Sequence, residues 1–143
     1  MMFTFPVELT PDDNGTVMAR IVGLPGATFG DDEADALANA VDLLETICTA
    51  FILDRQDIPV PKEAAGRPTV TPSLLGSLKL AVYEAMRAQG WRKADLARAM
   101  ALNPRQIDRL LDLRHASTVA QLEQALRICG REFEIATEVR EFA

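Results

Sequence analysis

The spacing of apolar residues changes near residue 70 and divides the chain into two halves. In residues 3–9 and 17–21, apolar and polar side chains alternate, which is the period of a half-buried β-strand. From Thr71 onward, apolar residues recur three and four positions apart, as one face of an α-helix requires. A chain of 143 residues is long enough for one domain or two small ones. We therefore expect an α+β protein with a strand-rich first half and an all-α second half.

Residues 1–61 predict three strands followed by one helix. The pair Asn14-Gly15 supplies a tight turn between the first two strands, and residues 27–29 form a short third strand. Asp31 and Asp32 then cap a helix, because a carboxylate accepts hydrogen bonds from free backbone N–H groups. The expected apolar face of that helix consists of Ala34, Leu37, Ala38, Val41, Leu44, Cys48, Phe51 and Ile52. This order predicts a βββα domain.

The segment Ile58-Pro59-Val60-Pro61 excludes helix, since each proline restricts itself and the residue before it. Residues 62–70 are expected as a linker, with Val70 as a candidate for one more short strand. Residues 71–143 form the second domain, with helices expected at 74–89, 93–100, 104–113 and 119–129. After them, apolar and polar residues alternate again, which predicts a final strand carrying Phe133, Ile135, Thr137 and Val139.

The second and third of these helices match a helix-turn-helix. Ala97 lies where the two helices cross, and Asn103-Pro104 caps the third helix with proline at its first position. Ala101 occupies a turn position that is often glycine in this motif. The outward face of the third helix carries arginine and glutamine, which can bond guanine and adenine in the major groove. The expected DNA-binding residues, including two at the flanks for phosphates, are Lys93, Asn103, Arg105, Gln106, Arg109 and Arg114.

The alternative interpretation of this basic face is an ordinary solvated helix surface. In that case Asp108 would pair with Arg105, and Asp112 would pair with Arg109. The distribution of charge along the chain favours DNA binding over a solvated surface. The chain carries a net charge of −6, but residues 1–69 hold four bases and twelve acids, a net charge of −8. Residues 87–114 hold seven bases and three acids, a net charge of +4, so a polyanion would be attracted to this segment alone.

Catalysis and metal binding find little support in the sequence. A magnesium site would need carboxylates converging from strands and helices. The acids of the first half lie instead in a turn and at a helix start, where capping and solvation explain them: Asp12, Asp13, Asp31, Asp32, Glu33 and Asp35. His115 is the one histidine, and no glycine loop leads from a strand into a helix as phosphate binding requires. We expect no enzyme activity, no metal and no cofactor.

The remaining features favour a cytoplasmic protein. Cys48 and Cys129 lie far apart in helical patterns, so we expect two buried thiols in a reduced cytosol. The N-terminus lacks the basic residues and apolar run of a secretory signal. We expect no membrane span, because no window reaches the roughly 20 apolar residues that one needs.

Several segments together resemble the HicB antitoxin family. The first is Val22-Gly23-Leu24-Pro25-Gly26-Ala27-Thr28-Phe29-Gly30-Asp31-Asp32-Glu33-Ala34, continuing to Ala36-Leu37-Ala38-Asn39-Ala40. The second is Ile58-Pro59-Val60-Pro61, similar to the family's closing segment, and the second half looks like the Cro-type helix-turn-helix of one branch. The resemblance runs from about Phe3 to Ile135. One departure is Val22-Gly23, where the family often has Pro-Asp.

The resemblance implies a partial RNase H-like first domain that has lost its catalytic carboxylates. In the family this domain binds HicA, a small toxin with a double-stranded-RNA-binding fold that cleaves mRNA with a histidine. The second domain is implied to dimerise, or to form a tetramer with added contacts from the first domains, and to repress the operon by binding operator DNA. The residues that contact the toxin stay unassigned. The competing interpretation is a stand-alone helix-turn-helix repressor whose first domain senses a ligand or oligomerises.

Overall fold

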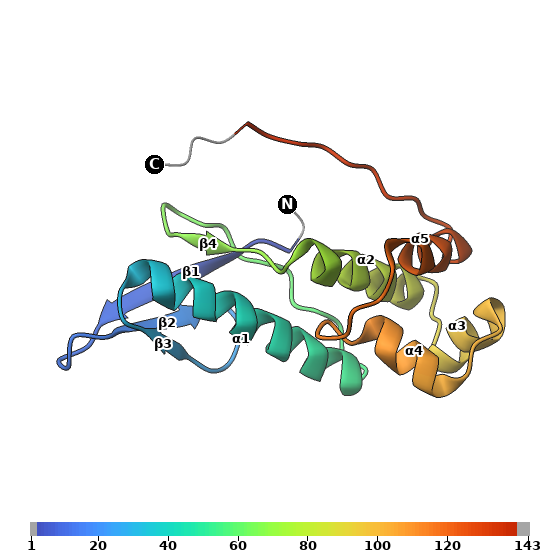
Figure 1. Cartoon of the computed structure of the whole chain (residues 1–143), viewed down its shortest axis with the longest axis horizontal. Helices are drawn as coiled ribbons and strands as arrows, with labels where there is room; N and C mark the ends of the chain where they lie inside the picture. The colour runs from blue at the N-terminus through green and yellow to red at the C-terminus, as the bar shows by residue number, and fades with distance from the viewer. Residues whose placement is uncertain (1–2, 140–143) are drawn as a thin grey trace.

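The computed structural model describes residues 3–139 and is α+β, as expected (Figure 1). Within those residues, a four-stranded antiparallel sheet has the order β3-β2-β1-β4, and five helices follow or cover it. Helix α1 lies along one face of the sheet, and α2 to α5 gather beyond one end of it (Figure 1). The bounds are β1 Phe5–Pro11, β2 Val17–Ile21, β3 Thr28–Gly30, α1 Glu33–Leu53, β4 Thr69–Val70, α2 Leu74–Ala88, α3 Lys93–Met100, α4 Pro104–Leu111 and α5 Val119–Ile128.

The first hairpin confirms the alternation seen in the sequence. Val7 on β1 lies opposite Ile21 on β2, and both side chains are buried. Ala19, two residues before Ile21, is buried on the same face. The turn is closed by the Asp12 N–H, which donates to the Thr16 carbonyl at 2.8 Å. Gly15 supplies the positive φ of 88° that the turn needs. The face of the hairpin that carries these apolar residues is the one that α1 covers.

The fourth strand, β4, lies inside the segment expected as a linker. It pairs antiparallel with β1, placing Val70 opposite Phe5, and the Val7 N–H donates to the Pro68 carbonyl at 2.8 Å. The candidate strand at Val70 is thereby confirmed. Because β4 forms an edge of the sheet and leads directly into α2, it ties the strand-rich half to the helical half.

Helix α1 begins where the sequence predicted, and most of its expected apolar face is confirmed, except at two alanines near its start. The Asp32 carboxylate caps the helix by accepting the Asp35 N–H at 2.8 Å. Ala34 and Ala38, expected inside, are exposed. The expected Leu44, Cys48 and Ile52 are buried, and the expected Leu37, Val41 and Phe51 are partly buried against the core. The buried side chains that were not expected are Ala36, Ala40 and Ile47. The first turns of α1 carry alanines on two faces, one with Ala34 and Ala38 and the other with Ala36 and Ala40. The contact with β3 buries the face that begins at Ala36.

Helix α1 also corrects the expectation about apolar windows. Its 21 residues are long and apolar enough to cross a membrane by length and composition alone. This property is not evident in the sequence, because the helix mixes alanine and threonine with its larger apolar residues and contains no unbroken apolar run. In the structure one face of α1 packs on the sheet, which is how the core helix of a globular domain also passes this test.

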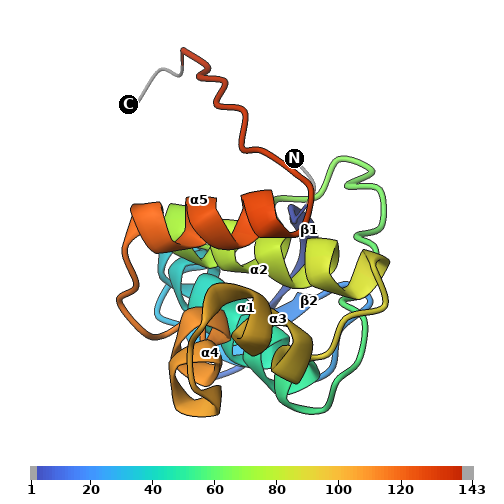
Figure 2. The same cartoon turned by 90° about the vertical axis from the view of Figure 1, so that its right-hand side faces the viewer.

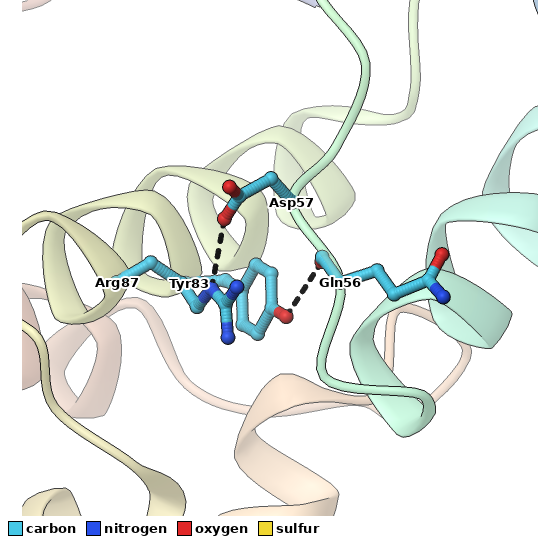
Figure 3. Close-up of polar contacts among 4 residues, drawn as sticks. All are labelled: Gln56, Asp57, Tyr83 and Arg87. Carbon is cyan, nitrogen blue, oxygen red and sulfur yellow. Dashed lines mark hydrogen bonds and ion pairs between the residues drawn. The ribbon is translucent and has the colours of Figure 1, made fainter.

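Polar contacts fasten the two halves together. The Tyr83 hydroxyl on α2 donates to the Gln56 carbonyl at 2.8 Å, and the Arg87 Nε donates to an Asp57 carboxylate oxygen at 2.8 Å (Figure 3). The Glu45 carboxylate on α1 accepts the Ser73 N–H at 2.9 Å, at the start of α2. Buried apolar side chains from both halves form one continuous cluster. The sheet and the helices therefore share a core.

The last described residues, 131–139, do not form the strand that their alternation predicted. A strand exists only where a neighbouring strand supplies hydrogen bonds, and the sheet edges at β3 and β4 do not pair with this segment. Residues 140–143, the end of the second expected domain, lie outside the described residues. In α2, the apolar Leu74 is 71% exposed, because it is the first residue of the helix.

Candidate nucleic-acid interface

Helices α3 and α4 form the pair that the sequence predicted, with α4 ending two residues earlier than expected. Leu96 and Ala97 on α3 are buried, as are Ile107 and Leu110 on α4. The small side chain of Ala97 allows the two helices to approach closely. Apolar packing therefore fixes the angle at which the outer face of α4 is presented.

The turn between these helices depends on a left-handed residue. Ala101 ends α3 with φ 55° and ψ 41°, a conformation that costs a non-glycine residue roughly 1 kcal/mol. The turn is closed by the Leu102 N–H, which donates to the Ala97 carbonyl at 2.9 Å. The alanine noted in the sequence thus occupies a position where glycine would adopt the same backbone without strain.

Two of the expected DNA-binding side chains hold the start of α4. The Asn103 Oδ1 accepts the Gln106 N–H at 2.8 Å, and the Gln106 Oε1 accepts the Asn103 N–H at 2.9 Å. This reciprocal capping box satisfies two backbone donors, and Pro104 at the first helical position has no donor to satisfy. Asn103 and Gln106 are exposed at the tip of the helix, but in this structure their oxygens are engaged in the cap.

The carboxyl end of α4 is held by Lys79, a residue that the sequence analysis did not single out. Its side chain is fully buried, and its Nζ donates to the carbonyl oxygens of Arg109 and Asp112 at 2.9 and 2.7 Å. A third bond reaches the Ser117 hydroxyl at 2.9 Å. The ammonium group therefore satisfies carbonyls that the helix leaves free at its last turn, and its charge complements the negative end of the helix dipole.

The environment of Lys79 lowers its pKa from 10.5 to about 8, chiefly because burial disfavours the charged form, while the Asp112 carboxylate partly opposes this. One sequence feature could have revealed this residue. Lys79 lies four positions after Leu75 and three before Val82, on the apolar face of the predicted helix. A lysine in that position must either extend to solvent or find buried acceptors.

Two arginines remain free on the outer face of α4. Arg105 and Arg109 are exposed, and between residues 3 and 139 neither guanidinium has a hydrogen-bond or ion-pair partner. The alternative pairs, Asp108 with Arg105 and Asp112 with Arg109, are not formed. Asp108 instead accepts a bond from the Lys93 Nζ at 3.0 Å, which links α3 to α4. Among the expected DNA-binding residues, Arg105 and Arg109 are therefore the two with unengaged charge.

Arg114 is directed away from this face. Its guanidinium donates to the Thr46 hydroxyl at 3.1 Å and approaches the Asp42 carbonyl at 3.5 Å, both on α1. The sequence placed Arg114 beside the recognition helix but gave no sign that α1 packs there. The structure thus brings Lys93, Asn103, Arg105, Gln106 and Arg109 onto the α3–α4 pair, and separates Arg114 from them.

An exposed helix face with two unpaired guanidinium groups, Arg105 in the first turn and Arg109 in the last, is suited to an anionic partner. The end view shows α3 and α4 side by side at the surface, below α5 and α2 (Figure 2). Arginine bonds both phosphate and the guanine edge, and the helix dipole adds positive potential at the start of α4. Among residues 3–139, no three histidine, cysteine, aspartate or glutamate side chains are placed to hold a metal ion. The two unpaired arginines make this face a candidate for binding an anion such as nucleic acid.

Comparison with known proteins gives one consistent result. The chain is 28% identical over 141 residues to Antitoxin HicB of Pseudomonas fluorescens, covering 96% of both chains. It is 28% identical to Antitoxin HicB 2 of Photorhabdus laumondii, covering 92% of this chain and 94% of that one. It is also 28% identical to Antitoxin HicB of Escherichia coli, covering 92% and 96%. No protein-family model matches the chain. Because these matches span both the sheet and the helices, they support the HicB antitoxin family for this protein.

Proposed function

We propose that this protein is the antitoxin of a toxin–antitoxin pair, and that it binds and neutralises a small HicA-type ribonuclease. The observation that carries the proposal is the nearly full-length similarity to three proteins named Antitoxin HicB. The first half has a composition suited to such a partner, since its net charge of −8 would attract a basic RNA-binding toxin. We assign toxin binding to residues 1–61, interpreted as a partial RNase H-like domain in which α1 covers one face of the sheet.

We further propose that residues 71–143 form a helix-turn-helix domain that represses the operon. In this assignment α4 is the recognition helix, and Arg105 and Arg109 contact operator DNA. A homodimer would place two copies of α4 in successive major grooves, about 34 Å apart. The support is local: α4 has a sharply capped start, a buried inner face and two unpaired arginines outside. The expected cytoplasmic location would give access to both partners.

The antitoxin role can be tested with the tagged full-length chain purified from its native host. Mass spectrometry should identify a small, basic partner in a stoichiometric amount. Co-expression of that partner with this chain should restore growth that the partner alone arrests. Recovery of the chain alone, in a preparation that still binds DNA, would contradict the antitoxin role and favour the stand-alone repressor.

Replacing Arg105 with alanine should weaken operator binding by about 10- to 100-fold, the loss expected for one bidentate contact to a base. Discrimination between the operator and a variant site should fall with it. The matched control is Arg127→Ala, which removes the same charge from α5, where Arg127 pairs with Glu123. Fluorescence anisotropy at fixed salt would measure both variants. Equal affinities for wild type and Arg105→Ala would show that α4 does not read the operator.

A further inference from the structure

The outer face of α4 carries one acidic side chain beside its two free arginines. Asp108 and Arg109 follow Arg105 by three and four positions, so the three side chains lie on one side of the helix. The Asp108 side chain is 59% exposed. The Lys93 Nζ donates to its Oδ1 at 3.0 Å, and its Oδ2 has no partner among residues 3–139. Asp108 therefore presents a free acceptor on a face whose arginines present only donors.

The fold does not account for this carboxylate. The other two acids of the basic segment, residues 87–114, have local structural roles. Asp95 accepts a backbone N–H at the start of α3, and Asp112 accepts one in the turn after α4. Within the described chain, the Asp108 side chain makes no bond to the backbone and holds only Lys93. Exposed ion pairs of this kind contribute little to stability, so the position calls for a different explanation.

A carboxylate on a DNA-facing surface has opposite effects on phosphate and on one base edge. Phosphate oxygens are acceptors with negative charge, so a carboxylate repels them. In the major groove, cytosine presents its N4 amino group, a donor that a carboxylate accepts. Arginines alone bond to any phosphate that they reach. An element that penalises wrong partners adds specificity that attraction alone does not supply.

We propose that Asp108 is a specificity-determining residue of the operator interface. It selects a cytosine near the base read by Arg105, and it weakens binding to other DNA. The inference rests on the proposed repressor function, in which α4 enters the major groove. Lys93 lies at the start of α3, and its ammonium group has further N–H donors besides the one that Asp108 accepts. Lys93 is therefore free to meet a phosphate while the Asp108 Oδ2 faces the base.

The base preference is tested with the full-length chain and a library of randomised DNA duplexes. Sequences selected by the wild type should contain one position at which cytosine is strongly preferred. Asp108→Asn keeps the shape of the side chain but removes its charge, and asparagine bonds adenine readily. This variant should lose the cytosine preference at that position and keep the preferences at the others. Arg105→Ala should lose the preference at a different position.

Affinity measurements separate specificity from general attraction. Asp108→Asn should bind a scrambled duplex about 3- to 10-fold more tightly than the wild type, because the repulsion of phosphate is removed. The ratio of its affinities for the selected site and the scrambled duplex should fall roughly tenfold. The matched control is Glu123→Gln, which removes the same charge from another exposed ion pair, with Arg127 on α5. The control should leave the ratio unchanged in fluorescence anisotropy at fixed salt.

Lys93→Met distinguishes a direct contact of Asp108 from an effect through Lys93. It should weaken binding to all sequences and reduce its salt dependence, but the cytosine preference should remain. Loss of that preference with Lys93→Met, or wild-type selection or an unchanged affinity ratio with Asp108→Asn, would each overturn the role of Asp108. Those results would leave the repressor function standing, because the wild type still selects an operator. A wild type that selects no sequence at all would contradict the repressor function, and the role of Asp108 with it.

Discussion

Replacing Gly30 with alanine is expected to destabilise the protein by at least about 3 kcal/mol. Gly30 ends β3 and lies directly against the first turn of α1. A Cβ at this position would lie 2.1 Å from the Ala36 backbone nitrogen and 2.6 Å from the Ala36 Cα. These atoms belong to the backbone of a capped helix, so they cannot rotate away as a flexible side chain would. Either β3 or the start of α1 must move, and the core at Ala36 and Ala40 opens with it.

Chemical denaturation followed by circular dichroism would measure this loss. Gly15→Ala is the matched control, because a Cβ there meets nothing within 4 Å. That variant carries only the backbone cost of φ 88°, roughly 1 kcal/mol. Similar losses for the two variants would contradict the steric explanation. Under the proposed function, Gly30→Ala should also reduce toxin capture by disturbing the α1–β3 contact, while Gly15→Ala should retain it.

The parts of the fold that were predicted correctly depend on local chemistry. Asp32 and Asn103 indicate helix starts, because each side chain accepts a hydrogen bond from the backbone N–H three residues later. The β1–β2 hairpin follows from alternation and from Gly15 in its turn. Such features require no knowledge of distant segments, so the order of the elements from β1 to α5 and most of their boundaries could be predicted.

The parts that were not predicted depend on contacts between distant segments. The choice between Ala34 and Ala36 as the inward position of α1 is made by β3, and alanine spacing alone does not reveal it. Arg114 bonds Thr46, 68 residues away, so its separation from the outward residues of α3 and α4 follows from how the halves pack. In residues 131–139 the sequence predicted a strand that does not form. Their alternation is that of a strand, but no strand of the described residues pairs with them.

The candidate site shows the same division. Sequence spacing identified the α3–α4 pair and its outward residues, which are set by helical periodicity. It did not separate the side chains that hold the pair from those left free. Lys93 is engaged by Asp108 and Gln106 by the helix cap, whereas Arg105 and Arg109 are unengaged. Only the packed structure makes this distinction.

The second large effect is expected from Lys79→Met, which should reduce the free energy of unfolding by about 2–4 kcal/mol. Methionine fills a similar volume but leaves the carbonyls of Arg109 and Asp112 without the buried donor that now satisfies them. Because these carbonyls end α4, operator binding should weaken as well under the proposed function. Lys62→Met is the control, since the Lys62 side chain makes no hydrogen bond or ion pair within residues 3–139.

The dependence on pH gives this prediction a distinct signature. Since the pKa of Lys79 is lowered from 10.5 to about 8, the folded chain releases this proton at a lower pH than the unfolded chain. Between about pH 8 and 10.5 the unfolded state binds more protons, so the contribution of Lys79 to the free energy of unfolding rises with pH in that window. The difference in stability between wild type and Lys79→Met should therefore widen above pH 8, and nuclear magnetic resonance should detect Lys79 titrating near pH 8. A constant difference up to pH 10.5, or titration near 10.5, would mean that Lys79 extends to solvent and does not hold the end of α4.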